Sequence, residues 1–236
     1  MKPFAAFDID GTLIRWQLYH AIVDHLAKKN LLGPDATERL HKARMKWKRR
    51  EHPGAWGEYE LAVISTFEAA FDTLSTEEFD LAAQEVTQEY GNQTYVYTRN
   101  LIKKLKNEGF FLVAISGSQH EIVGHIAQQY GFDDWVGTNY HRANDRFHDK
   151  PFVASRDKAA VLTKLIKKHG LQAAGSLAIG DSASDASMFE LVDQPIAFNP
   201  DQILYDLARK HRWKIVLERK NVIYELEATD GHYQLA

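Results

Sequence analysis

The chain has no cysteine among its 236 residues. Disulfide bonds and thiolate catalysis are therefore excluded, and the composition is consistent with a reducing compartment. An excess of charge of one sign is also absent, because 29 Lys and Arg residues stand against 32 Asp and Glu residues, which gives a formal net charge of -3. Such a balance provides no general attraction to nucleic acid or to anionic membranes, so we expect neither as a partner.

Long apolar runs are missing as well. The apolar stretch at the amino terminus is brief and is interrupted by Asp8 and Asp10, so it lacks the core of a signal peptide. No segment has the uninterrupted apolar length that crosses a membrane. These absences predict a cytoplasmic protein, whereas its oligomeric state stays open.

Apolar runs that alternate with helical patterns predict an α/β fold with a doubly wound parallel sheet. The pattern predicts strands over residues 4–7, 110–115, 135–138, 177–179 and 196–198, helices over 96–107, 120–130 and 201–210, and hairpins over 139–155 and over 214–217 with 222–226. We expect the last ten residues to be loosely ordered.

Residues 15–92 follow a helical pattern throughout. Breaks at Gly33-Pro34-Asp35 and His52-Pro53-Gly54, with a capping pattern at Ser75-Thr76-Glu77-Glu78, divide this segment into four helices. We therefore predict a core domain of residues 1–14 and 93–236, with residues 15–92 inserted as an all-helical cap, a small four-helix bundle.

Two carboxylates follow the first predicted strand. Asp8 and Asp10 come directly after the buried run, and Gly11 marks the turn that ends it. Open α/β sheets bind ligands at the carboxyl ends of their strands, so both acids are expected at a ligand site. A carboxylate can accept a phosphoryl group covalently, which makes Asp8 the candidate nucleophile. Asp10 lies two residues further and projects to the same side, where it can pass a proton to the leaving oxygen.

Residues that favour an anion follow later in the chain. Ser116 and Gly117 end the second buried strand and offer a hydroxyl and backbone N–H groups just before a helix. Lys158 opens an amphipathic segment, so its ammonium can point from the first turn of a helix toward the same anion. Thr12 is a further candidate, whose hydroxyl either contacts the ligand or braces the turn. Together these residues predict a phosphate-binding site.

Crowded carboxylates predict a cation. Asp181 lies in the cluster Gly180-Asp181-Ser182-Ala183-Ser184-Asp185, directly after the predicted strand 177–179. Carboxylates that share one site repel each other unless a cation joins them, and oxygen ligands beside a phosphate favour Mg²⁺. We therefore expect Asp181 to complete a magnesium site.

The order and chemistry of these clusters resemble the haloacid dehalogenase superfamily, and specifically its phosphoserine-phosphatase-like branch. The resemblance rests on Asp8-Ile9-Asp10-Gly11-Thr12, on Ser116-Gly117-Ser118, on Lys158 and on the cluster 180–185, and it spans nearly the whole chain. It implies the following roles: Asp8 as nucleophile, Asp10 as general acid and base, Ser116 and Gly117 as phosphoryl binders, Lys158 as the neutralising cation, and Asp8, the carbonyl of Asp10 and Asp181 as ligands of Mg²⁺, with support from Asp185.

The chain departs from the pattern of that branch in two motifs, at three positions. Gln17, a neutral amide, stands where phosphoserine phosphatases carry a Glu that meets the ammonium of the substrate, which puts phosphoserine itself in doubt. Ser182 and Ser184 replace a Gly and an Asn of the fourth motif. Both serines can donate hydrogen bonds, so we expect these replacements to adjust the properties of the site without abolishing it.

The predicted cap carries a basic run, Lys42 to Arg50, whose bland interpretation is a solvated helix face. The alternative is that Arg44 or Arg49 reaches the cleft and pairs with an anionic part of the leaving group. The aromatic residues Trp16, Trp47, Trp56 and Tyr59 favour packing over ligand stacking. The histidines show no metal spacing, and His20 and His25 are interpreted as ordinary helix surface.

These observations predict a Mg²⁺-dependent phosphatase of small phosphorylated metabolites that works through an aspartyl phosphate. A phosphotransferase or mutase would use the same intermediate and pass the phosphoryl group to another alcohol. A non-catalytic binding module that docks an anionic partner on the basic helix is the third hypothesis, although the intact Asp8, Asp10, Lys158 and Asp181 argue against it.

Overall fold

A single mixed sheet organises the protein. The computed structural model describes residues 2–229 and 232–235. Within these residues the strand order is β4-β3-β2-β1-β5-β6-β7-β8-β9. The strands are β1 (Pro3–Phe7), β2 (Phe111–Gln119), β3 (Asp134–Ala143), β4 (Arg146–Phe152), β5 (Gln172–Gly180), β6 (Gln194–Phe198), β7 (Lys214–Arg219), β8 (Val222–Thr229) and β9 (His232–Leu235). Strands β1, β2, β3, β5, β6 and β7 run parallel, whereas β4, β8 and β9 add antiparallel edges.

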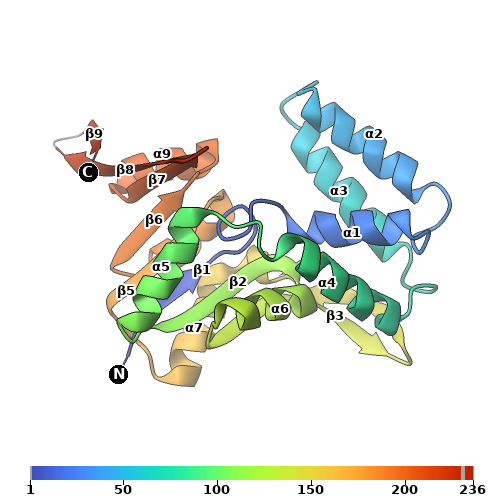
Figure 1. The fold of residues 1–236 in the computed structure, drawn as a ribbon, viewed down its shortest axis with the longest axis horizontal. Helices are drawn as coiled ribbons and strands as arrows, with labels where there is room; N and C mark the ends of the chain where they lie inside the picture. Colours follow the sequence, from blue (N-terminus) through green and yellow to red (C-terminus); the bar gives the residue numbers. More distant parts are fainter. Residues whose placement is uncertain (1, 230–231, 236) are drawn as a thin grey trace.

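Helices cover both faces of the sheet because the buried strands are apolar on both sides. In β1, Ala5 and Phe7 belong to the hydrophobic core of one face, and Phe4 and Ala6 to the core of the other. The first core includes residues of α5 (Val96–Asn107) and α6 (His120–Tyr130), and the second includes residues of α7 (Lys158–His169), α8 (Ala186–Phe189) and α9 (Gln202–His211). Figure 1 shows α5 and α6 on the near face. The predicted doubly wound α/β fold is confirmed.

Several predicted boundaries need correction. Strands β2 and β3 are longer than predicted, since the polar residue Gln119 still pairs with Thr138. The expectation that the last ten residues are loosely ordered is wrong where the structure describes them, because β9 pairs with β8. Residues 230, 231 and 236 of that segment lie outside the described residues. Among the described helices, none combines the length and apolar character that a membrane span requires.

Four helices lie between β1 and α5, as the sequence predicts. They are α1 (Leu18–Lys28), α2 (Ala36–Lys48), α3 (Ala55–Glu68) and α4 (Thr76–Tyr90). Helix α4 begins with the predicted capping box, in which Ser75 and Glu78 bond each other's backbone N–H groups. Helices α2 and α3 pack side by side beyond α1, while α4 packs against both α1 and α6 (Figure 1). The division of residues 15–92 into a separate domain remains a prediction, because α4 packs both against α1 and against α6, a helix that covers the sheet.

The β3–β4 hairpin extends the sheet toward these helices. Arg142 on β3 forms ion pairs with Asp80 of α4 and Glu121 of α6, at 2.8 Å and 2.9 Å. At the hairpin turn, Asp145 accepts a hydrogen bond of 2.6 Å from the hydroxyl of Thr76. The hairpin therefore fastens the helical segment to the core at a point remote from β1.

Candidate active site

The sheet brings the predicted residues together at the carboxyl ends of three adjacent strands. Asp8 follows β1, Ser116 lies near the end of β2, and Asp181 follows β5. The backbone N–H of Asp8 donates a hydrogen bond of 2.9 Å to the carbonyl of Ile179, so the turn after β1 is fixed to β5. Residues separated by more than 100 positions in the sequence thus line one edge of the sheet, as expected for a ligand site in an open α/β sheet.

Lys158 is the cation of this site. It is the first residue of α7, and its side chain is only 1% exposed. Its Nζ lies 2.7 Å from Oδ1 of Asp8 and 2.5 Å from Oδ1 of Asp185. The two carboxylates raise the pKa of Lys158 above its usual range despite its burial. The ammonium therefore stays charged and orients Asp8.

Three acids form a group that could hold a metal ion. Asp8, Asp181 and Asp185 each offer one carboxylate oxygen, and these oxygens all lie within 4.8 Å of one another. Oδ2 of Asp8 is buried and has no hydrogen-bond partner among the described residues. Several carboxylates beside a single lysine leave an excess of negative charge that a hard divalent cation would offset. The residues therefore fit Mg²⁺.

The pKa directions agree with this excess of negative charge. Burial, opposed by Lys158 and reinforced by Asp185 and Asp10, raises the pKa of Asp8 to about 7. Burial and the neighbouring Asp8 raise the pKa of Asp181 well above its usual range. Additional positive charge nearby would favour the ionised forms of both acids.

Asp10 lies beside this acidic group and makes different contacts. Its Oδ1 accepts a hydrogen bond of 2.5 Å from the backbone N–H of Leu18, and its Oδ2 accepts one of 2.5 Å from the hydroxyl of Ser116. Burial raises the pKa of Asp10, and these hydrogen bonds oppose the rise. The Asp10 carboxylate is thus placed outside the three-acid group. Its carbonyl, the atom that the resemblance implies for the metal, stays a prediction.

Asp185 organises the loop after β5. Its Oδ2 accepts hydrogen bonds from the backbone N–H groups of Asp181 and Ser182, at 3.1 Å and 3.0 Å, and from the Ser182 hydroxyl at 3.1 Å. The hydroxyls of Ser182 and Ser184 lie 2.9 Å apart. Ser182 therefore supports the loop, in agreement with the expectation that the substituted serine keeps donating hydrogen bonds.

Ser116 and Gly117, in the last part of β2, lie beside the acids, since the Ser116 hydroxyl bonds to Asp10. The Ser116 hydroxyl accepts a hydrogen bond of 2.9 Å from the backbone N–H of Ser118. A Cβ at Gly117 would lie 3.0 Å from the hydroxyl oxygen of Ser155, a close contact that requires this side chain to shift slightly. Thr12 is fully buried, and its hydroxyl has no partner among the described residues. The turn-bracing alternative therefore has no side-chain hydrogen bond among the described residues to support it, and contact of Thr12 with a ligand stays a prediction.

Gly11 is required by the close approach of Asp181. Its φ is +82°, and a Cβ at this position would lie 1.9 Å from Oδ2 of Asp181. Only glycine combines this backbone conformation with room for the carboxylate.

Two backbone contacts that the sequence does not indicate join the helical segment to this site. The N–H of Leu18 bonds to Asp10, and the N–H of Tyr19 donates to the Ser118 hydroxyl at 2.8 Å. Both come from the first turn of α1, where backbone N–H groups have no partner within the helix. No side-chain signal marks such contacts in a sequence.

The predicted specificity residues are spread over the cap. Gln17 is half-buried directly before α1, and its side chain makes no capping hydrogen bond. Arg44 pairs with Asp24 at 3.2 Å and lies over the Trp16 ring, whereas Arg49 pairs with Glu51 at 3.6 Å and its side chain is 67% exposed. Contact of these residues with a substrate stays a prediction.

The interpretation of His20 as helix surface is wrong, since this side chain is only 4% exposed. Its ring contacts the rings of Trp16, Trp56 and Tyr59. Burial, with a smaller contribution from Arg44, lowers the pKa of His20 to about 4. The sequence around His20 does not indicate this burial, because two of the rings that cover it come from α3, more than 30 residues away. His25 is half-buried and pairs with Glu85 at 2.7 Å.

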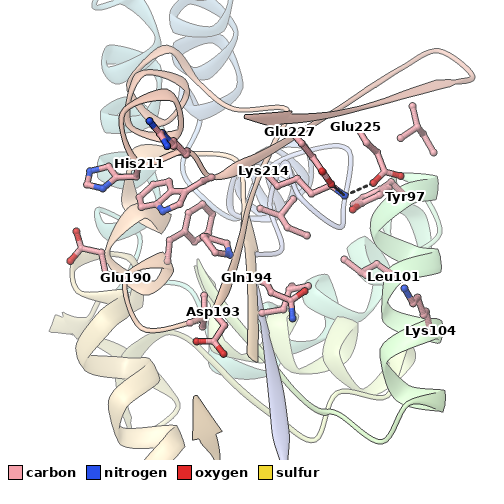
Figure 2. A pocket seen from close by; sticks show the side chains of 18 of the residues that line it. Tyr97, Leu101, Lys104, Glu190, Asp193, Gln194, His211, Lys214, Glu225 and Glu227 are labelled. Carbon is pink, nitrogen blue, oxygen red and sulfur yellow. Dashed lines mark ion pairs between the residues drawn. The ribbon is translucent and has the colours of Figure 1, made fainter. Parts of the chain in front are cut away.

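A groove of about 1120 Å³ lies elsewhere, between α5 and the strands β6, β7 and β8. Figure 2 shows Lys214 of its lining paired with Glu225 and Glu227, at 2.6 Å and 3.5 Å. Gln194 and Lys214 begin β6 and β7, so the groove opens at the amino ends of the strands, opposite the acids. None of the predicted site residues lines it.

Solved structures show the same fold. A protein of unknown function from Bordetella pertussis Tohama I matches with a TM-score of 0.73 at 19% identity, over 91% of this chain and 98% of that one. A phospho-aspartyl intermediate analogue of phosphoserine phosphatase matches with a TM-score of 0.62 at 20% identity, over 93% and 94%.

Two curated relatives are phosphatases by name. The phosphoserine phosphatase of Archaeoglobus fulgidus is 23% identical over 88% of this chain, which spans only 55% of that protein. The histidinol-phosphatase of Neisseria meningitidis serogroup C is 25% identical over 92% of this chain and 99% of the relative. The pattern of the haloacid dehalogenase-like hydrolases matches residues 5–190, which include every residue of the site described above. By this match, the chain belongs to the haloacid dehalogenase-like hydrolase family.

Proposed function

We propose that the protein is a magnesium-dependent phosphatase of small phosphomonoesters in which Asp8 accepts the phosphoryl group. The observation that carries this proposal is the position of Asp8 between Lys158, at 2.7 Å, and the acidic group with Asp181 and Asp185. One cation orients the nucleophile while the acids offer oxygen ligands, which are the parts that phosphoryl transfer requires. Family membership and the relatives' names support the same activity.

In the first step, Asp8 attacks phosphorus and the bond from phosphorus to the leaving oxygen breaks. Asp10, whose pKa is raised by burial, gives its proton to that oxygen. In the second step, Asp10 takes a proton from water, the water oxygen bonds to phosphorus, and the bond from phosphorus to Asp8 breaks. Ser116, which bonds to Asp10 in this structure, would turn its hydroxyl to the phosphoryl oxygens.

Asp8 and Asp181, supported by Asp185, would hold Mg²⁺. When bound, this ion supplies positive charge that keeps the acids ionised and offsets the charge of the phosphate. The free Oδ2 of Asp8 and the raised pKa values support this assignment.

The relatives suggest two substrates to test first, phosphoserine and histidinol phosphate. Both are phosphate esters of primary alcohols that also carry an amino group. Gln17 cannot form an ion pair with that ammonium, so we expect poor selectivity for phosphoserine. A cytoplasmic location remains a prediction.

Phosphate release from a panel of phosphorylated amino acids, amino alcohols, sugars and nucleotides tests this proposal. We expect hydrolysis that needs Mg²⁺ and that stops when the metal is chelated. Consumption of substrate with transfer to an added alcohol in place of phosphate release would favour a phosphotransferase, and inactivity across the panel would favour a binding module.

A further inference from the structure

Glu218 on β7 is a buried acid whose partners come from a distant part of the chain. It is only 7% exposed, and its two carboxyl oxygens accept hydrogen bonds of 3.1 Å and 2.8 Å from the backbone N–H groups of Val96 and Tyr97. Lys214, a cation on the same strand, pairs with other acids, and Glu218 forms no ion pair among the described residues. Burial of an acid without a cation costs free energy unless hydrogen bonds replace its water. The two N–H groups therefore hold this side chain in place.

These two N–H groups belong to the first turn of α5. Val96 and Tyr97 are its first two residues, and the side chain of the N-cap residue Tyr95 makes no capping hydrogen bond. The first N–H groups of a helix have no partner within the helix, and the helix dipole favours an acid at this end. Glu218 supplies the missing acceptors. The start of α5 is thereby attached to a strand that lies more than 120 residues further along the chain.

The start of α5 also bonds to the loop after β1. The hydroxyl of Thr98, which is fully buried, donates a hydrogen bond of 2.9 Å to the carbonyl of Thr12. The backbone N–H of Tyr95 donates one of 3.0 Å to the carbonyl of Leu13. These two carbonyls follow Asp10 by only two and three residues. A displacement of α5 would therefore displace this acid as well.

A second set of contacts leads from Glu218 to the acids after β5. The backbone N–H of Glu218 donates a hydrogen bond of 2.8 Å to the side-chain oxygen of Asn199, which directly follows β6. Two residues later, the backbone N–H of Asp201 donates one of 2.8 Å to the carbonyl of Asp181. The end of β7 is thus connected both to the loop of Asp10 and to the loop of Asp181.

We propose that Glu218 is a positioning residue of the active site. By holding the start of α5 against the end of β7, it fixes the position of Asp10 relative to Asp181. It acts through the Thr98 hydroxyl and the loop after β1. The inference rests on the proposed function, and it assigns a part in the reaction to a residue outside the range 5–190 that matches the family.

The experiment compares Glu218→Gln with Ser75→Ala, which removes the cap of α4 beside the β3–β4 turn. Glutamine offers one acceptor oxygen in place of two, and its NH₂ group meets the second N–H group of α5. Both substitutions should lower the melting temperature, because each weakens a helix cap. Only Glu218→Gln should lower kcat, by about tenfold or more at an unchanged KM, because a small displacement of the reacting groups slows the chemical step.

The rates are measured with Mg²⁺ and with the ester that the wild-type protein hydrolyses fastest in the panel described above. A wild-type kcat in Glu218→Gln, together with a lower melting temperature, would show that this residue only caps α5. That result would overturn the inference and leave the phosphatase assignment standing. Absence of hydrolysis by the wild-type protein across the whole panel would instead refute the proposed function.

A second substitution tests the path through α5. Thr98→Val keeps a similar side-chain shape and removes the hydroxyl that bonds to the carbonyl of Thr12. Alone it should lower kcat about tenfold, again at an unchanged KM. If Glu218 acts through this hydroxyl, the double variant Glu218→Gln/Thr98→Val should lose only about tenfold in total, whereas independent effects would multiply to about a hundredfold. A hundredfold loss, or a wild-type kcat in Thr98→Val, would overturn the inference.

Discussion

Lys158 donates a hydrogen bond of 2.7 Å to one carboxylate oxygen of Asp8, while the other oxygen of Asp8 is buried without a partner among the described residues. The lysine thus fixes the acid and leaves one oxygen free. Because Asp185 contacts the same ammonium at 2.5 Å, removal of Lys158 would leave two buried acids without a counter-charge.

Lys158→Met should therefore destabilise the fold by about 3–5 kcal/mol, the usual cost of breaking a buried ion pair on one side. Activity should be lost as well. Urea unfolding at pH 7 measures the change in the free energy of unfolding. Lys164→Met, an exposed lysine on the same helix, is the control and should stay within about 0.5 kcal/mol of the wild type. Similar effects of the two substitutions would contradict the role assigned to Lys158.

Asp8→Asn should abolish turnover without loss of stability. The amide oxygen of Asn can still accept the hydrogen bond from Lys158. The substitution also removes a buried carboxyl group whose pKa is raised to about 7. Phosphate release and the melting temperature are measured in parallel, with the exposed Asp72→Asn as control. A fully active Asp8→Asn protein would refute the nucleophile assignment.

Alanine substitutions at two glycines distinguish the effect of backbone strain from the effect of displacing Asp181. Gly11 and Gly33 have similar φ angles, +82° and +89°, but a Cβ at Gly33 meets nothing within 4 Å, whereas at Gly11 it would lie 1.9 Å from Asp181. Each substitution by Ala should cost about 1–2 kcal/mol of stability through the backbone, because a Cβ at positive φ approaches the following carbonyl oxygen. Only Gly11→Ala should reduce kcat/KM by more than about a hundredfold, or 2.7 kcal/mol. If Gly33→Ala lost activity to the same degree, displacement of Asp181 would not be the cause.

His20 should make the fold sensitive to acid. Its pKa is lowered to about 4 in the folded state, against 6.5 as its usual value, so the unfolded chain binds a proton that the folded chain refuses. The contribution of neutral His20 to the free energy of unfolding is fully present above pH 6.5. It is lost as the pH decreases toward 4, by up to about 1.4 kcal/mol per pH unit. Unfolding curves of the wild type and of His20→Asn over this window measure the difference. Parallel curves would show that His20 is not buried as a neutral ring.

The fold and the grouping of the acids could be predicted because their signals are local. Buried strands appear as continuous apolar runs, and the acids follow them directly, as Asp8 follows β1. The length of β2 could not be predicted, since the polar residues after Ile115 continue the ladder through pairing with β3. The burial of His20 depends on α3, which lies beside α1 only in the folded chain. The contacts of Leu18 and Tyr19 use backbone atoms, which every residue has.

The central claim is that Asp8 carries the phosphoryl group during turnover, and an acid quench tests it most directly. The Mg²⁺-loaded protein is mixed with a substrate that it hydrolyses, quenched within one turnover, digested and analysed by mass spectrometry. We predict one added phosphoryl group on the peptide that contains Asp8, absent after alkaline treatment and absent in Asp8→Asn. Full turnover with no phosphoryl group on that peptide at any quench time, or with the group on another residue, would contradict the account.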